Sequence, residues 1–280
     1  MRTLYVSDLD GTLLGADQRL SDASRSIIND LVAEGMLFTV ATGRSLPPTE
    51  LVLRGLDLRL PIICMNGGLI VDPLSREIVR QVSLDPARAE ALVRGHVAHG
   101  LHPFVFTIDR YGEHHAYHLG IFNEVERRYV AARLALGDRR FRVVDDLASA
   151  FEDEVMTVVS IDSPDRVDPV YDVFAGDPGL YQVRSADDRA PEFWWLETLN
   201  VDANKGAGVR VLRERLGVDR VVCFGDQAND LPMFEEADEA YAVEGAVDSA
   251  RALATATIGS HRDDAVARYL RTVRSSPAAV

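Results

Sequence analysis

The feature that most constrains the fold is an alternation of short, continuously apolar segments with amphipathic helical segments. Apolar segments of strand length occur at residues 4–7, 37–41, 61–65, 221–224 and 240–243. Between the first two, a helix is expected from a cap at Ser21 to a stop at Gly35, with its apolar residues on one face. Fully apolar strands that alternate with such helices predict a doubly wound, parallel-sheet α/β fold of the Rossmann-like kind.

The middle of the chain has a different pattern of expected helices and strands. A helix is expected from the Asp85 cap to Gly100, and further helices at 123–136 and 165–175. Strands are expected at 104–108, 115–119, 155–161, 180–184 and 193–197. Paired strands with a few helices predict an α+β domain at 82–189, inserted into a core formed by 1–81 and 190–280.

Net charge, the length of the apolar runs and the cysteines limit the classes of function that are possible. The net charge of −14 argues against nucleic acid or an anionic membrane surface as a partner. No apolar run approaches the roughly 18 residues of a membrane helix, and no secretion signal is recognised. Both cysteines, Cys64 and Cys223, lie in apolar strand segments and are expected to be reduced core residues of a cytoplasmic protein.

Polar residues gather directly after the apolar strands, where the carboxyl ends of parallel strands form a crevice. They are Asp8 and Asp10, then Thr42, Gly43 and Arg44, then Lys205, and last Asp226, Asn229 and Asp230. Each cluster alone could make a turn or cap a helix. Buried carboxylates without a partner cost several kcal/mol, so a pair such as Asp8 and Asp10 indicates a metal ion, a counter-charge or a role in catalysis.

The chain resembles the haloacid dehalogenase-like superfamily, in its Cof-like branch of class IIB phosphatases with a large inserted cap. The motifs that carry the likeness are DLDGT from Asp8, ATGR ending at Arg44, MNGG containing Asn66, NKGAGV containing Lys205, and GDQANDLPMF containing Asp226. They span the chain apart from the inserted domain, which would be the cap that sets substrate specificity.

The resemblance implies an Mg²⁺-dependent phosphatase that acts on a small phosphorylated metabolite, with a sugar phosphate as the expected class. By that likeness, Asp8 is the nucleophile that forms an aspartyl phosphate, and Asp10 is the general acid and base. The Asp8 and Asp226 carboxylates and the Asp10 main-chain carbonyl would hold Mg²⁺. The remaining roles are phosphate binding by Thr42, Gly43, Lys205 and Asn229, support from Asp230, and tentative crevice positions for Asn66 and for Arg44, which could equally form a surface salt bridge.

Several alternatives stay open at this point. One is phosphoryl transfer to another sugar, as in a mutase, and another is a phospholigand-binding regulatory protein without turnover. In the inserted domain, His114, His115 and His118 form a cluster that is more easily an exposed hairpin than a zinc site. The run Arg139, Arg140 and Arg142 is expected to be solvated. The sequence identifies neither the substrate nor the oligomeric state.

Overall fold

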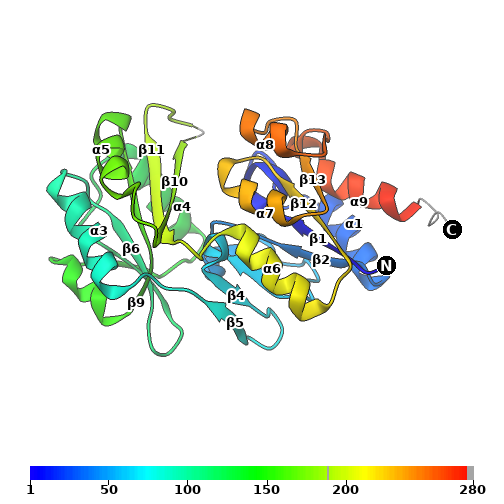
Figure 1. The fold of residues 1–280 in the computed structure, drawn as a ribbon, viewed down its shortest axis with the longest axis horizontal. Coiled ribbons are helices and arrows are strands. Elements are labelled where there is room, and N and C mark those ends of the chain that lie inside the picture. The colour runs from blue at the N-terminus through cyan, green and yellow to red at the C-terminus, as the bar shows by residue number, and fades with distance from the viewer. Residues whose placement is uncertain (188, 276–280) are drawn as a thin grey trace. The chain divides into compact units, whose positions relative to one another are not determined.

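The computed structural model describes residues 1–187 and 189–275, and it divides into two compact units (Figure 1). The first unit comprises Met1–Gln81 and Asn204–Val280, and the second comprises Val82–Ala203. The second unit is therefore an insertion in the first. Its far boundary lies after residue 203 and not at 190, because strand β11 (Trp194–Asn200) pairs with strands of the inserted unit on both sides.

A five-stranded parallel sheet forms the centre of the first unit, in the order β14-β13-β12-β1-β2. Its strands are β1 (Thr3–Ser7), β2 (Leu37–Val40), β12 (Arg220–Gly225), β13 (Glu239–Ala242) and β14 (Ala256–Thr257). The predicted apolar segments at 4–7, 37–41, 221–224 and 240–243 lie in four of these strands, which confirms the parallel α/β core.

Helices cover both faces of this sheet. The helices of the first unit are α1 (Asp22–Ala33), α2 (Leu46–Val52), α6 (Lys205–Leu216), α7 (Leu231–Glu236), α8 (Asp248–Leu253) and α9 (Ala265–Ser275). On one face, Leu4 and Val6 pack in a core with Leu212 of α6. On the other face, the ring of Phe224 packs edge-on against Tyr269 of α9. The Ser21 side chain accepts a hydrogen bond from Ser24 N and caps α1, as predicted.

The predicted strand at 61–65 forms, but outside the parallel sheet. It is β3 (Ile62–Cys64), which pairs with β4 (Leu69–Val71), and β4 pairs in turn with β5 (Ile78–Gln81) in a small antiparallel sheet. A single bridge between Ala41 and Ile63 links β3 to the end of β2. A buried 3-10 turn, Met65–Gly67, follows β3, and Asn66 N donates to the carbonyl oxygen of Thr42, just after β2.

The second unit is built on a six-stranded sheet in the order β10-β11-β9-β6-β7-β8. Besides β11, its strands are β6 (Phe104–Ile108), β7 (His114–His118), β8 (Phe141–Val143), β9 (Glu154–Asp162) and β10 (Leu180–Ala186). Helices α3 (Pro86–Ala98) and α5 (Pro164–Phe174) pack on β9 and β11, while α4 (Glu124–Ala135) carries Tyr129, whose ring contacts Phe104 and Trp195 on the other face. The α+β character predicted for this domain is thus what the structure shows.

One side chain of the second unit differs from expectation, and the structure also gives the contacts of the β7 histidines. Arg140 is buried rather than solvated, because its guanidinium forms a close ion pair with the buried carboxylate of Asp138. The β7 histidines have separate partners: His118 Nδ1 lies 2.9 Å from the Gly120 carbonyl oxygen, and His115 Nε2 lies 3.5 Å from Asp109. Within the described residues, no metal-ligand group includes these histidines.

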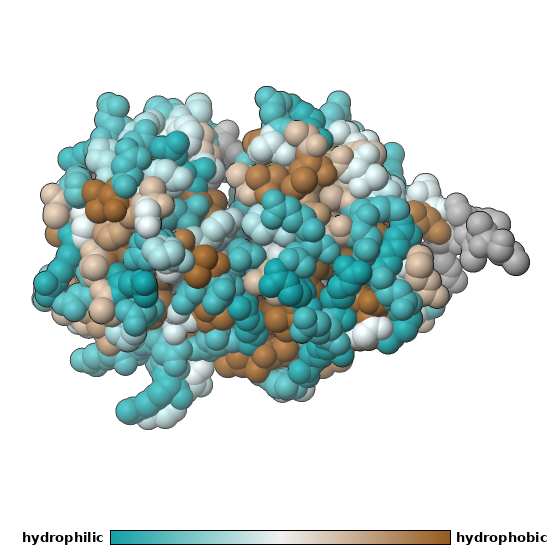
Figure 2. Space-filling view, in the orientation of Figure 1, coloured by the Kyte–Doolittle hydropathy of each residue, from teal (hydrophilic) through white to brown (hydrophobic). Residues whose placement is uncertain are grey.

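The face of the molecule shown in Figure 2 is mostly hydrophilic, with apolar residues exposed in several places. Among the described residues, none of the helices combines the length and apolar character needed to cross a membrane.

Candidate active site

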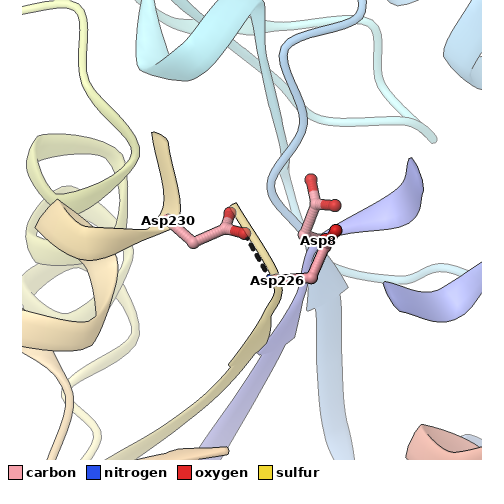
Figure 3. A group of neighbouring side chains, drawn as sticks. All are labelled: Asp8, Asp226 and Asp230. Carbon is pink, nitrogen blue, oxygen red and sulfur yellow. Dashed lines mark hydrogen bonds between the residues drawn. The ribbon is translucent and has the colours of Figure 1, made fainter. Parts of the chain in front are cut away.

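Two neighbouring parallel strands bring the first pair of predicted residues together. Asp8 follows β1 and Asp226 follows β12, and the two strands pair in register from Thr3 with Arg220 to Ser7 with Phe224. Both carboxylates therefore lie at the carboxyl edge of the sheet, as Figure 3 shows. Asp8 and Asp226 are each buried.

The turn after β1 is shaped to approach Asp226 closely. Gly11 has φ +78°, and a Cβ built on it would overlap the Asp226 carboxylate. Thr12 Oγ1 donates a hydrogen bond of 2.7 Å to Asp226 Oδ1. A glycine is required at position 11 because of its positive φ and because any side chain there would overlap Asp226. The Thr12 hydroxyl holds one oxygen of the Asp226 carboxylate in place. This Thr12 contact was not anticipated, although the threonine stands in the motif that drew attention to Asp8.

Lys205 is the first residue of α6, where the side chain of Asn204 caps the helix by accepting from Ala207 N at 2.8 Å. Its ammonium donates to Asp8 Oδ1 and to Asp230 Oδ1, each at 2.5 Å, and the side chain is fully buried. It is also the one lysine among the 280 residues of the sequence, in which arginine supplies every other cationic side chain apart from histidine.

Asp230 organises the loop that carries Asp226. Its Oδ2 accepts hydrogen bonds from the backbone N–H groups of Asp226 (2.8 Å) and Gln227 (2.9 Å), the first of which is drawn in Figure 3. A Cβ on Gly225 would come within 2.6 Å of the Asp230 carboxylate, so that glycine leaves room for the loop to close. Asp230 thus uses one oxygen for the loop and the other for Lys205.

The electrostatics of this cluster are those of a cation site. Carboxylate oxygens of Asp8, Asp226 and Asp230 lie within 4.8 Å of one another, and Lys205 offsets one of the three negative charges. Burial, followed by the neighbouring carboxylate of Asp230, raises the pKa of Asp226 to about 7. Burial likewise raises the pKa of Asp8, against the opposing effect of Lys205. Burial alone would lower the pKa of Lys205, but the two carboxylates outweigh it and raise that pKa.

A second group of polar residues lies in the loop after β2. The backbone N–H of Asn66 donates to the Thr42 carbonyl oxygen at 3.0 Å, and a Cβ on Gly43 would stand 3.2 Å from Asn66 Oδ1. Asn229 Nδ2 donates to the same Asn66 oxygen at 3.0 Å. Asn66 is buried and adopts φ +52°, a left-handed conformation that asparagine tolerates better than most residues. Asn66 therefore connects Thr42 to Asn229 by hydrogen bonds and lies against Gly43, so all four predicted positions are neighbours.

Arg44 and Asp10 form a third contact, which was not predicted. Arg44 Nε donates to Asp10 Oδ2 at 2.6 Å and Nη2 donates to Asp10 Oδ1 at 2.5 Å. Asp10 is the more exposed partner. Arg44 thus forms a salt bridge within the site, and not on a helix surface.

Comparison with known proteins identifies the family. A family model for haloacid dehalogenase-like hydrolases matches residues 5–270, and the chain therefore belongs to that family. The chain is 26% identical to 5-amino-6-(5-phospho-D-ribitylamino)uracil phosphatase YitU of Bacillus subtilis. The alignment spans 275 residues and covers 96% of each of the two chains.

Solved structures share the fold. A haloacid dehalogenase-like hydrolase from Bacillus subtilis has a TM-score of 0.83 at 19% identity, covering 97% of this chain and 99% of that one. A structure described as a subclass IIB sugar phosphatase of the same superfamily has a TM-score of 0.77 at 17% identity, covering 98% and 99%. The expected family and fold are confirmed, and the names of the relatives support an enzyme of the phosphatase type.

Proposed function

We propose that this protein is an Mg²⁺-dependent phosphatase that hydrolyses a small phosphorylated metabolite through an aspartyl phosphate on Asp8. The observation that carries the proposal is the buried cluster in which Asp8 meets the ammonium of Lys205 beside Asp226 and Asp230. A carboxylate in such a place can attack a phosphoryl group only if surrounding cations offset the combined negative charge.

The residues present fit a divalent cation. Three buried carboxylates and one ammonium leave two negative charges, and oxygen ligands of this kind suit Mg²⁺. We expect the carboxylates of Asp8 and Asp226 and the main-chain carbonyl of Asp10 to hold the ion. Asp230 has both oxygens engaged by Lys205 and backbone N–H groups, which fits a supporting role. When bound, the cation neutralises charge on the phosphoryl oxygens.

The chemistry then divides into two displacements at phosphorus. In the first, a carboxylate oxygen of Asp8 bonds to phosphorus, the bond to the leaving oxygen breaks, and Asp10 gives that oxygen its proton. In the second, a water oxygen bonds to phosphorus, Asp10 takes the water proton, and the bond to Asp8 breaks. The cycle releases an alcohol and inorganic phosphate and leaves both aspartates as they began.

The transferring phosphoryl group needs fixed donors around it. Lys205 provides a positive charge beside the attacking oxygen of Asp8, and the backbone N–H at Gly43 and the hydroxyl of Thr42 belong to the adjoining loop. The Asn229 amide is linked to that loop through Asn66. We assign these groups to phosphate binding, where donors set in place before the reaction contribute most to the rate.

Substrate choice is assigned to the second unit, Val82–Ala203, as a cap domain. The substrate class we propose is a phosphorylated sugar or sugar alcohol. This agrees with a relative named for a phosphoribityl compound and with a fold neighbour described as a sugar phosphatase. The location expected for such an enzyme is the cytoplasm, which stays a prediction.

The test is release of inorganic phosphate from a panel of phosphorylated sugars, sugar alcohols and other metabolites, with Mg²⁺ and with EDTA. Asp8→Asn is the matched variant, since it keeps the size of the side chain. Release that requires both Mg²⁺ and Asp8 supports the proposal. Transfer of phosphate to a second sugar without net release would favour a mutase, and tight binding of phosphorylated compounds without turnover would favour a regulatory binding protein.

A further inference from the structure

The ion pair between Arg44 and Asp10 combines a buried cation with a partly exposed anion. The Arg44 side chain is 6% exposed and the Asp10 side chain is 41% exposed. Two parallel hydrogen bonds, from Nε and Nη2, occupy one site on each carboxylate oxygen. A bidentate pair of this kind fixes the plane and the direction of a carboxylate, which a single contact does not.

The backbone that carries Arg44 is itself held in place. Arg44 N donates to Thr42 Oγ1 at 3.1 Å, and the Arg44 carbonyl oxygen accepts from Met65 N at 2.9 Å. With its main chain fastened on both sides and its side chain buried, the guanidinium has little freedom to turn. Asp10 lies in the segment that leaves β1 and turns at Gly11 with φ +78°.

The two cations of the site also differ in chemical type. Lys205 meets Asp8, the proposed nucleophile, as a compact ammonium, whereas Arg44 meets Asp10 as a planar fork. Because the chain contains a single lysine, an arginine at position 44 agrees with the preference of the whole sequence for arginine over lysine. The choice still has a consequence, because a lysine at 44 would supply charge without the two-point contact.

We propose that Arg44 is a positioning residue that orients the Asp10 carboxyl group toward the leaving oxygen and toward the attacking water. In the acid form the proton would lie on the side of one carboxyl oxygen that faces away from the guanidinium, and in the base form both oxygens would accept from Arg44. This assignment rests on the proposed phosphatase function and on the acid–base role given there to Asp10. It differs from a phosphate-binding role for Arg44, in which the guanidinium would hold the substrate itself. It also differs from a structural role, in which the ion pair would only stabilise the loop.

The leaving group distinguishes these roles. A sugar alkoxide needs a proton from Asp10 as it departs, whereas the phenolate of p-nitrophenyl phosphate departs without one. If the Asp10 carboxyl group is no longer correctly oriented, the first displacement should slow for a sugar phosphate but not for p-nitrophenyl phosphate. Hydrolysis of the aspartyl phosphate needs Asp10 with either substrate, so the first turnover must be measured separately from the steady state.

The experiment compares wild type, Arg44→Met, Arg44→Lys and Asp10→Asn on a sugar phosphate and on p-nitrophenyl phosphate, in Mg²⁺. Arg59→Met is the control for loss of one positive charge, because Arg59 pairs with Asp57 on the surface of the same unit. Circular dichroism and thermal melting confirm that each variant is folded, and added guanidinium tests for rescue of Arg44→Met.

We expect both Arg44 variants to lower kcat for the sugar phosphate by about 10- to 100-fold, part of the 10²–10⁴-fold that a general acid–base contributes, with little change in KM. The first-turnover burst of p-nitrophenolate should stay within about 3-fold of wild type, and guanidinium should restore part of the lost rate. Combining Arg44→Met with Asp10→Asn should add little to the effect of Asp10→Asn alone, because the two residues act as one unit.

Four results would overturn the assignment. A rise in KM with kcat unchanged would make Arg44 a phosphate-binding residue, and an equal loss of the sugar phosphate rate and of the p-nitrophenolate burst would make its role structural. Wild type that hydrolyses neither substrate would refute the proposed function, and the assignment of Arg44 with it. An active wild type with unchanged Arg44 variants would refute the assignment alone.

Discussion

Replacing Lys205 with methionine should destabilise the protein strongly at neutral pH in the absence of metal. Methionine matches the length of the side chain but removes the ammonium that meets Asp8 and Asp230 at 2.5 Å. Breaking a buried ion pair by removing one partner costs about 3–5 kcal/mol, because the other charge stays buried. Here three carboxylates would remain together without a cation, so we expect a loss at the upper end of that range.

The loss should depend on pH with a defined sign. Burial raises the pKa of Asp226 to about 7 and raises that of Asp8, so the folded state holds protons on these groups that the unfolded chain has already released. For Asp226 in wild type, the cost of the negative charge is therefore full above about pH 7 and declines as the pH falls toward about 4, below which both states are protonated. Lys205 lowers the pKa of both carboxyl groups, so its removal raises both pKa values further. The deficit of Lys205→Met should therefore be largest above about pH 7 and smaller at acidic pH, where the carboxyl groups of both folded proteins are protonated.

Mg²⁺ should offset part of the same deficit. An ion that binds the folded state alone, at 100 times its dissociation constant, stabilises it by about 2.7 kcal/mol. Chemical denaturation of wild type and Lys205→Met with EDTA and with Mg²⁺, at pH 7.5 and 5, measures both effects. The double variant with Asp230→Asn, which removes one carboxylate as well, should recover much of the lost stability.

Arg210→Met is the matched control on the same helix. Arg210 forms an exposed ion pair with Glu236, and such pairs contribute about 0–1 kcal/mol. If Lys205→Met in EDTA at pH 7.5 were within about 1 kcal/mol of wild type, as Arg210→Met should be, the buried carboxylates could not all carry charge, and the electrostatic reasoning for a cation site would fail.

Two further substitutions test other parts of the structure. Burial lowers the pKa of His96 to about 4, so on acidification from about pH 6.5 the unfolded chain takes up this proton first and the free energy of unfolding should fall by up to about 3 kcal/mol. In denaturant titrations His96→Gln should flatten this pH dependence, and a pH dependence equal to that of wild type would contradict the assignment to His96. Gly11→Ala should weaken Mg²⁺ binding by about 10- to 100-fold in a metal titration of thermal stability, because its Cβ would displace Asp226. Gly35→Ala is its control, since φ is +97° there and nothing lies near its Cβ.

Much of the fold follows from local sequence. Capping residues and apolar periodicity act over a few residues, so the ends of helices such as α1 and α3 could be read from Ser21 and Asp85. Strand pairing is a long-range property with no such local signal. This is why β3 could not be separated from the parallel sheet, and why β11 was given to the wrong side of the domain boundary.

The candidate site shows the same division. Residues in motifs at strand ends, such as Asp8 and Asp226, were predicted because parallel strands bring their carboxyl ends to one edge. Lys205 can also be picked out from a count of residue types, because it is the one lysine in the sequence. The pairing of Arg44 with Asp10 had none, since nothing in either segment specifies which of the chain's many carboxylates a given arginine will meet.

The central claim is that Asp8 carries the phosphoryl group during turnover. The most direct measurement is mass spectrometry of enzyme that is mixed with excess substrate and Mg²⁺ and quenched in acid within the first turnover. We predict phosphate on the peptide that contains Asp8, absent from Asp8→Asn and lost when the quench is delayed until substrate is exhausted. Turnover with no covalent phosphate at any time, or with phosphate on a different residue, would contradict the claim.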